Sequence, residues 1–579
     1  MAKIKSKYPE IKDDNFYKKI NTLYDDYKIK KDKTFNEICH PKKYELQMPQ
    51  KFIGEFINPE TPYMGILVYH RIGAGKTCAS IRAAEKWKKY KRIIVVLPAS
   101  LKGNFRTELR SQCADESYLK NNEKKTLQSL HPKSKEYKEI IKKSDERIDE
   151  YYEIYSYNKF IELIKDKKIN LKNALLIIDE IQNMVSEDGS FYEILLKAIN
   201  SAPKDLRIIL MSATPMFDKP NEIALTLNLL RLPKSLPVGL AFDKKFIKIN
   251  SKKNGEYTHN VINIDLFKEH IKGYISFFRG APPFTFPTMK TKYIRCEMTP
   301  FQFSSYKKVL GNETDKTKIK SILKSMNVSD LPNNFYIGTR VISNIVFPNK
   351  KINEDGFDSL TTNNILKNLH SYSCKFHEIM NKINNSTGKV FIYSGFKEYG
   401  GIKSFARILD AFGYKDYIKY GEGKKRYAVW SGDESVATKD EIKAVYNMKN
   451  NLKGQMLRII LGSPSIKEGV SLTAVRQVHV LEPYWNKSRL DQVVGRASRF
   501  CSHKDLEEEF RTVKVYVYIA TSPDKKIQTV DEFIHSLAER KENIIRTFEK
   551  AIKEVAIDCN LNKKANVYEG EQDIKCATK

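Results

Sequence analysis

The sequence predicts an α/β protein with two units, each built on a parallel β-sheet. Short apolar runs of strand length occur in both halves of the chain, and segments of helical character follow them. The chain has 579 residues, which is too long for one hydrophobic core, and 41% of them are hydrophobic. This composition supplies enough apolar surface for more than one core and excludes global disorder.

A phosphate-binding loop follows the first apolar run, Ile66–Tyr69. The loop has the sequence His70-Arg-Ile-Gly-Ala-Gly-Lys-Thr77, and a segment that is predicted to be helical comes directly after it. A strand, then Gly-x-Gly-Lys-Thr, then a helix is the context in which this pattern binds a nucleoside triphosphate such as ATP. Backbone N–H groups at the helix N-terminus are expected to face the phosphates, from Gly73, Ala74, Gly75, Lys76 and Thr77.

Two side chains of the loop have predicted roles of their own. Lys76 is expected to neutralise the β- and γ-phosphates, and the Thr77 hydroxyl is expected to hold Mg²⁺. His70 stands where the general pattern has its first glycine. The loop therefore departs from the general pattern at its first position.

An acidic pair follows a second buried strand, Leu175–Ile178. Asp179 stands where that strand leaves the sheet and is expected to bind Mg²⁺ through water. Glu180 is the expected base that polarises the attacking water. A third apolar run ends in Ser212-Ala-Thr-Pro215, whose hydroxyl groups can link the nucleotide site to a neighbouring domain.

The second half of the chain carries a pair of arginines. Val390–Tyr393 and Arg458–Leu461 read as strands of another α/β unit, and Asp491-Gln-Val-Val-Gly-Arg-Ala-Ser-Arg499 follows them. Arg496 and Arg499 are three positions apart, which places them on one face of a helix. We expect both guanidinium groups to reach γ-phosphate oxygens from across a cleft.

In this order the segments resemble motifs I, II, III, V and VI of the superfamily-two helicases and translocases. Ser465–Leu472 is similar to motif V, which adds Gly469 to the implied ATP contacts. The resemblance implies two RecA-like domains with ATP between them and arginines that act in trans. Further segments are similar to chromatin-remodeller-type ATPases, and Gln50 fits the glutamine that reads adenine there; the segments are 97–108, 215–230 and 482–486.

Two departures narrow the resemblance. Motif I lacks an acidic start, and motif II reads Asp-Glu-Ile-Gln instead of Asp-Glu-x-His. Together with the segments Phe277–Pro287 and Glu554–Cys559, these departures make the sequence similar to a group of proteins from nucleocytoplasmic large DNA viruses. That group includes the small subunit of the poxvirus early transcription factor and nucleoside triphosphatase I. The resemblance covers residues 44 to 560 and implies a viral RNA polymerase or a second transcription-factor subunit as partner, in the virion and the host cytoplasm.

The charge and the cysteine content indicate which partners and which cellular compartment are compatible with the sequence. The chain has 101 Lys and Arg against 70 Asp and Glu, a formal charge of +31 that favours a nucleic acid partner. Part of the excess of positive charge is accounted for by the high lysine content that is typical of proteins encoded by AT-rich genomes. Eight cysteines show no metal-ligand spacing and are interpreted as reduced thiols. No secretory signal or membrane span is expected.

The sequence divides into five expected segments. They are a charged N-terminal segment, a first lobe, a helical insertion with linker, a second lobe and a C-terminal helical extension, at 1–43, 44–235, 236–380, 381–525 and 526–579. Within the first lobe, residues 114–150 read as an exposed helical insertion.

Three functions are compatible with these features. The first is a DNA-dependent ATPase that translocates during early viral transcription, in initiation or termination. The second is an ATP-dependent RNA helicase. The third is a promoter-recognition or assembly subunit whose ATPase remodels a transcription complex. The remodeller-like segments favour DNA over RNA. Unwinding, polarity and oligomeric state are left open by the sequence.

Overall fold

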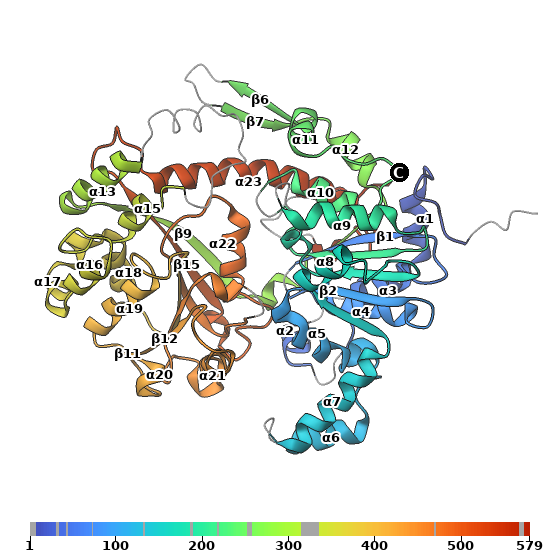
Figure 1. The fold of residues 1–579 in the computed structure, drawn as a ribbon, viewed down its shortest axis with the longest axis horizontal. Coiled ribbons are helices and arrows are strands. Elements are labelled where there is room, and N and C mark those ends of the chain that lie inside the picture. The colour runs from blue at the N-terminus through green and yellow to red at the C-terminus, as the bar shows by residue number, and fades with distance from the viewer. Residues whose placement is uncertain are drawn as a thin grey trace, which may run out of the picture. The chain divides into compact units, whose positions relative to one another are not determined.

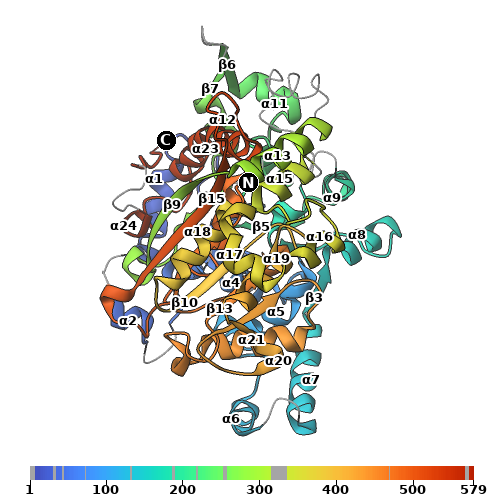
Figure 2. The same ribbon diagram turned by 90° about the vertical axis from the view of Figure 1, so that its left-hand side faces the viewer.

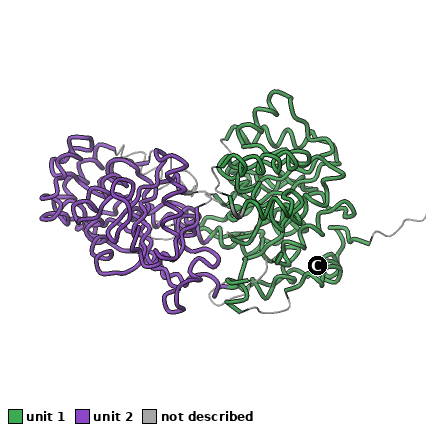
Figure 3. The backbone as a smooth tube through the Cα atoms, turned by 90° about the horizontal axis from the view of Figure 1, so that it is seen from below, with its two compact units in different colours: residues 1–282, 544–579 green, residues 283–543 purple. Residues whose placement is uncertain are grey.

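The computed structural model of the protein consists of two compact units (Figure 3). Unit 1 contains residues 1–282 and 544–579, and unit 2 contains residues 283–543. The structure describes residues 7–29, 34–41, 45–71, 73–130, 134–185, 189–216, 219–251, 257–313, 335–467, 470–566 and 573–578. Each unit contains a parallel β-sheet, which confirms the predicted fold class.

The sheet of unit 1 has the strand order β3-β2-β4-β5-β1-β8, and all its pairings are parallel. Its strands are β1 (Gly65–His70), β2 (Arg92–Leu97), β3 (Tyr152–Ser156), β4 (Ala174–Ile178), β5 (Arg207–Ser212) and β8 (Ile275–Phe278). The central strands are buried along their length because helices cover both faces. One face carries α3 (Met48–Phe56), α4 (Lys76–Trp87) and α5 (Lys102–Leu109), and the other carries α8 (Tyr157–Lys165) and α9 (Ser190–Ser201) (Figure 1).

Smaller elements surround this sheet. The predicted helical insertion forms α6 (Asn121–Ser129) and α7 (Lys135–Asp149), and ion pairs from Arg106 and Arg110 to Asp145 attach α7 to α5. An antiparallel hairpin joins β6 (Ile247–Ser251) to β7 (Tyr257–Val261). The other helices are α1 (Phe16–Leu23), α2 (Phe35–Cys39), α10 (Glu222–Asn228), α11 (Gly239–Phe246), α12 (Ile264–Ile271) and α24 (Lys563–Asn566), with 3-10 turns η1 (Asp25–Tyr27), η2 (Ala99–Leu101), η3 (Gln112–Ala114) and η4 (Ile181–Asn183).

The sheet of unit 2 has the order β11-β12-β13-β10-β14-β15-β9 and is also parallel throughout. Its strands are β9 (Thr288–Glu297), β10 (Lys389–Tyr393), β11 (Lys415–Asp416), β12 (Arg426–Trp430), β13 (Ile459–Gly462), β14 (Val475–Val480) and β15 (Thr512–Thr521). Two apolar clusters lie against this sheet, and adjacent residues of β10 alternate between them. This alternation is the pattern of a strand that is covered on both faces.

The helices of unit 2 supply these two clusters. The helices that contribute residues to the first cluster are α13 (Pro300–Glu313), α15 (Ile337–Asn344), α16 (Glu354–Ser359), α17 (Thr362–Tyr372), α18 (Cys374–Asn384) and α19 (Ile402–Ala411) (Figure 2). The second cluster contains residues of α20 (Tyr417–Tyr420), α21 (Val436–Asn447) and α22 (Lys487–Val494). The 3-10 turns are η5 (Pro283–Thr285), η6 (Lys449–Asn451), η7 (Pro464–Lys467) and η8 (Glu508–Phe510).

The long helix α23 (Val530–Glu554) has contacts in each unit. Near its start, Asp531 forms a buried ion pair of 2.6 Å with Lys375 of α18. Near its end, Phe548 packs against the rings of Phe242 and Phe267. No helix in the part of the chain that the structure describes is long and apolar enough to cross a membrane.

The compact units differ from the segments expected from the sequence. The expected insertion at 236–380 is divided at residue 282, so that β8 belongs to unit 1 and β9 to unit 2. The expected C-terminal extension is divided at residue 543. Neither β8 nor β9 is predicted as a strand from the sequence.

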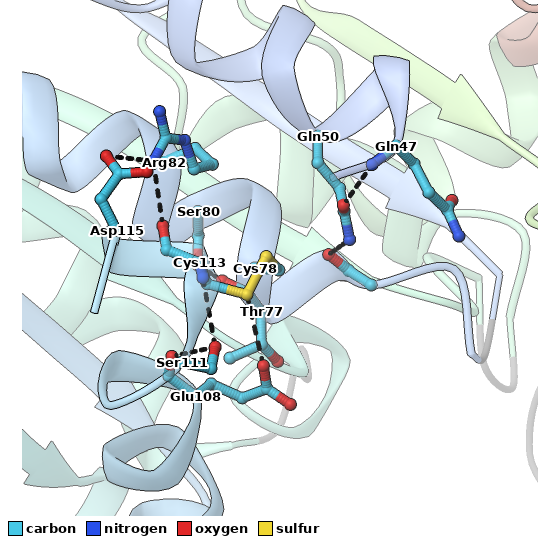
Figure 4. Close-up of a disulfide and its surroundings, with 11 residues drawn as sticks. Gln47, Gln50, Thr77, Cys78, Ser80, Arg82, Glu108, Ser111, Cys113 and Asp115 are labelled. Atoms are coloured by element: carbon cyan, nitrogen blue, oxygen red, sulfur yellow. Dashed lines mark hydrogen bonds and ion pairs between the residues drawn. A yellow bond between two sulfur atoms is a disulfide. The ribbon is translucent and has the colours of Figure 1, made fainter. Parts of the chain in front are cut away.

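The expectation that all cysteines are reduced is wrong. Cys78 is bonded to Cys113 (Figure 4). Cys559 is bonded to Cys576. Cys78 lies in the first turn of α4 and Cys113 in η3, and packing of these two elements brings the sulfurs together. The two residues are 35 positions apart, so a search for short cysteine spacings does not detect the pair.

Candidate active site

The phosphate-binding loop begins at the end of β1 and ends at the first turn of α4. Gly73 and Gly75 adopt left-handed backbone conformations, with φ of 82° and 73°. Only glycine takes this conformation at low cost. A Cβ atom on Gly75 would also lie 2.1 Å from Nε2 of Gln50. The backbone therefore turns sharply and directs the N–H groups of the α4 N-terminus toward the loop, where an anion can bind.

Gln50 of α3 lies against this loop. Its Oε1 accepts a hydrogen bond of 2.8 Å from the N–H of Gln47, and its Nε2 donates one of 3.4 Å to the Gly75 carbonyl (Figure 4). The side chain is buried, and these two bonds fix the orientation of its amide. The structure thus places Gln50 beside the phosphate loop. Its role in reading adenine stays a prediction.

Lys76 and Glu180 face each other. Nζ of Lys76 lies 3.9 Å from Oε1 of Glu180. Glu180 follows β4 in a left-handed conformation, with φ of 48°. The Tyr157 hydroxyl donates to the carbonyls of Asp179 and Glu180, at 2.6 and 3.0 Å, and holds this turn. The structure therefore brings the side chains of Lys76 and Glu180 together, and their roles toward phosphate and water stay predictions.

Asp179 is buried at the carboxyl end of β4. Its backbone N–H donates to Val96 of the neighbouring strand, and its Oδ1 accepts from the N–H of Glu180, each at 2.9 Å. Mg²⁺ prefers hard oxygen ligands. The Asp179 carboxylate and the Thr77 hydroxyl supply such oxygens, so these residues fit the ion.

Gln182 connects the acidic pair, Asp179 and Glu180, to β5, the strand that lies between β4 and β1 in the sheet. Its Nε2 donates to Oε2 of Glu180 at 2.6 Å, and its Oε1 accepts from the hydroxyl of Ser212 at 2.7 Å. The Ser212 oxygen in turn accepts from the N–H of Thr214 at 2.9 Å. A continuous set of hydrogen bonds therefore runs from the expected base to the loop after β5. The sequence analysis noted Gln182 as a departure but gave it no role.

Arg496 and Arg499 do not lie on a helix, so the expectation of one helical face is wrong. α22 ends at Val494, and Gly495 still donates its N–H to the Asp491 carbonyl at 2.8 Å, as in a helix. The N–H groups of Arg496 and Ala497 then donate to carbonyls only three residues back, at 3.1 and 2.9 Å. Arg496 is largely buried, and Nε of Arg499 donates to the Gly495 carbonyl at 3.3 Å. The regular α-helix therefore gives way to tighter turns before the first arginine, and the two arginines do not share a helical face.

The motif V and motif VI segments of unit 2 contact each other. The N–H of Leu472 donates to the Arg496 carbonyl at 2.9 Å. Gly469 lies outside the described residues, so its predicted contact with ATP stays a prediction. The structure thus brings together Gln50, Lys76, Asp179 and Glu180 in unit 1, and Arg496 and Arg499 in unit 2.

Two helicase family models match the two halves of the chain. Residues 56–223 match the DEAD/DEAH box helicase family, and residues 374–501 match the helicase conserved C-terminal domain. The chain is 53% identical to a putative ATP-dependent RNA helicase of Acanthamoeba polyphaga mimivirus, over 98% of this chain and 99% of that protein. It is 26% identical to a termination factor NPH-I homologue of African swine fever virus, over 86% of this chain and 76% of that protein.

Among solved structures, the Hef helicase domain of Pyrococcus furiosus matches with a TM-score of 0.42 and 12% identity, over 85% of this chain and 97% of that chain. The family assignment comes from the mimivirus relative, which is similar along nearly its whole length. The chain belongs to the superfamily-two helicases, in a viral group related to the NPH-I proteins, and it is a helicase-type ATP hydrolase.

Proposed function

We propose that this ATPase is stimulated by DNA and translocates along it during viral transcription, in early initiation or in termination. The formal charge of +31 supports binding to a polyanion through its phosphates. The African swine fever virus relative is named a termination factor NPH-I homologue, which supports a role in transcription. By the same argument, the partners are a viral RNA polymerase or a second transcription-factor subunit, and the sites are the virion and the host cytoplasm.

The hydrogen bonds that link Glu180, Gln182 and Ser212 are the observation that carries this proposal. Glu180 orients the attacking water, and Lys76 neutralises charge on the phosphates. Thr77 and Asp179 would hold Mg²⁺, which would supply positive charge against the phosphates. A change at Glu180 when phosphate leaves is transmitted through Gln182 to the loop after β5. This path couples hydrolysis to movement of a segment outside the nucleotide site.

The arginines of unit 2 complete the proposed reaction. Arg496 and Arg499 act in trans on the γ-phosphate held by unit 1, when the two units close on ATP. Gln50 contacts adenine, and Gly469 contacts the nucleotide. Nucleic acid contacts are directed mainly to phosphates, which position the strand without reading its sequence.

The second candidate is an ATP-dependent RNA helicase. It is favoured by the name of the mimivirus relative, which is 53% identical to this chain. A third candidate, an assembly or promoter-recognition subunit, predicts weak binding to any naked nucleic acid and tight binding in the presence of a protein partner.

One parallel assay separates these candidates. ATP turnover is measured with duplex DNA, single-stranded DNA and RNA of matched length, with Lys76→Ala as the inactive control. We expect the largest stimulation by DNA. Stimulation by RNA alone would assign the helicase candidate, and no stimulation by any naked nucleic acid would assign the assembly subunit.

A further inference from the structure

Two segments from the sequence analysis, Phe277–Pro287 and Glu554–Cys559, have no role in the reaction described above. In the structure they meet at β8, the edge strand that pairs with β1. The N–H of Ile557 donates to the Ile275 carbonyl at 2.8 Å. The side-chain amides of Asn562 and Asn566 each donate to the Phe277 carbonyl at 3.2 Å. The segment 555–566 therefore binds along the strand beside the phosphate-loop strand.

A buried set of hydrogen bonds continues from this segment to the loop itself. Oδ2 of Asp558 accepts from the Ser276 hydroxyl at 2.5 Å, and its Oδ1 accepts from the N–H of Phe277 at 2.9 Å. The Ser276 oxygen lies 2.8 Å from Nε2 of His70. His70, Ser276 and Asp558 are all 0% exposed. His70 is the last residue of β1 and the first residue of the phosphate loop.

The direction of these bonds can be assigned. Ser276 has one hydroxyl proton, which is donated to Asp558. Nε2 of His70 must then carry a proton and donate it to the Ser276 oxygen. Burial and the positive charge of Lys76 lower the pKa of His70 to about 3, so its imidazole is neutral with the proton on Nε2. Burial raises the pKa of Asp558 to about 7, so above this pH the group is a carboxylate that orders both protons and fixes the orientation of the imidazole.

The same region also contacts the loop further along. The N–H of Arg71 donates to the Phe278 carbonyl at 3.1 Å. Ala74 packs in one apolar cluster with Phe278 and Ala565. A Cβ atom on Gly280 would lie only 3.4 Å from Cβ of Ala74, so the chain passes close to the loop here. The start and the middle of the loop thus both contact β8 or the C-terminal segment.

We propose that residues 555–566 are a support for the phosphate loop, and that Asp558 and Ser276 are positioning residues that act on ATP binding through His70. A histidine in place of the first glycine brings a buried N–H that needs an acceptor. Ser276 supplies that acceptor, and Asp558 orients Ser276. The departure in motif I and the two viral segments are therefore parts of one arrangement.

The test is Ser276→Ala in the full-length protein, which removes the hydroxyl between Asp558 and His70. Loss of one buried hydrogen bond corresponds to a change of about two- to ten-fold in an equilibrium constant. We expect the KM for ATP to rise by roughly this factor, with a smaller change in kcat. Steady-state ATP hydrolysis and the thermal unfolding midpoint are measured on the same preparations.

Tyr17→Phe is the matched control. The Tyr17 hydroxyl donates to the Val555 carbonyl at 2.8 Å, so this variant also loses one buried hydrogen bond to the same segment. It has no bond toward His70. We expect a similar decrease of the unfolding midpoint with an unchanged KM. If Ser276→Ala leaves KM at the wild-type value, or if both variants raise it equally, the positioning role is refuted.

Two further variants keep the result decisive if Ser276→Ala folds poorly. Oδ2 of Asp558 also accepts from Nδ2 of Asn562 at 3.0 Å, so an amide at position 558 must direct its NH₂ group at the Asn562 amide or at the N–H of Phe277, and Asp558→Asn should raise KM at least as much. In a His70→Leu background, Ser276→Ala should change KM by less than about two-fold, because the bond that it removes is already lost. A full additional effect in that background would overturn the route through His70. Absence of hydrolysis by the wild-type protein would instead contradict the nucleotide site itself.

Discussion

Glu180 contacts Lys76 on one side and Gln182 on the other, so its carboxylate is held in place from two directions. Glu180→Gln keeps the size of the side chain and removes the base. We expect ATP binding close to wild type and turnover lower by about 10²-fold or more. Equilibrium binding of a fluorescent ATP analogue and steady-state turnover measure the two effects. A loss of ATP binding as large as that of Lys76→Ala would show that Glu180 has a different role.

Asp558 gives unit 1 a specific dependence on pH. Burial raises its pKa from 3.8 to about 7, against the opposing effect of hydrogen bonds from Ser276, Phe277 and Asn562. The folded protein therefore binds this proton more tightly than the unfolded chain. The stability from this group is present below pH 4 and is lost as the pH rises to about 7. The difference between the two pKa values corresponds to roughly 4 kcal/mol.

Asp558→Asn removes this titration. We expect the unfolding midpoint of the wild type to fall relative to that of the variant as the pH rises from about 4 to about 7. Thermal unfolding of both proteins across this range measures the difference. A difference that does not depend on pH would show that the carboxyl group does not titrate in this window.

At the scale of elements, the start of α23 is attached to unit 2 by a buried ion pair. Lys375 binds Asp531 at 2.6 Å and also donates to Asn344 and the Leu481 carbonyl, at 2.9 and 3.0 Å. Lys375→Met would leave the Asp531 charge buried without its partner. We expect a loss of about 3–5 kcal/mol.

The exposed pair Lys351–Asp355 is the control for this prediction, because its lysine is 59% exposed and its aspartate 67%. Lys351→Met is expected to cost less than about 1 kcal/mol. Chemical unfolding of both variants gives the comparison. Equal losses would show that burial does not decide the contribution of these pairs.

The apolar runs predicted the elements that are buried on both faces. β1, β4 and β10 are continuous apolar strands between helix layers, so their sequences carry a clear signal. β9 is an edge strand with most of its residues exposed, and β8 has four residues, so neither gives a comparable pattern. The phosphate loop and the acidic pair can be predicted because the residues of each are contiguous in sequence.

Contacts between distant residues could not be predicted in the same way. Ser276 is 206 positions from His70 and 282 positions from Asp558, and nothing in the local sequence of any of them indicates the others. Gln182 was visible only as a departure from a pattern. Its hydrogen bonds to Glu180 and Ser212 depend on the strand order, which places β5 beside β4.

At the scale of the whole molecule, the proposed reaction needs residues from both units. Arg496→Ala and Arg499→Ala should each lower turnover by about 10³-fold or more, because such arginines stabilise charge in the transition state. ATP affinity should change much less. Substitution by Lys should rescue poorly, since a point charge cannot replace the guanidinium fork. Turnover close to wild type in the double alanine variant would refute the two-unit motor.

The formal charge of +31 leads to a separate prediction for the whole chain. DNA affinity should fall by about ten-fold or more between about 50 and 200 mM salt if several phosphates are contacted. Fluorescence anisotropy with a labelled duplex measures this dependence. An affinity that does not change with salt would mean that the charge reflects composition and that DNA binds elsewhere.

The division of unit 1 into residues 1–282 and 544–579 has a consequence for biosynthesis. All of unit 2 is synthesised before the last part of unit 1 is made. During this interval β1 and the phosphate loop already exist, but Asp558 and its neighbours do not. Domains generally fold as units during synthesis. The residues that support the phosphate loop are therefore made after all of unit 2, so the arrangement around His70 cannot form until residues 555–566 have been synthesised.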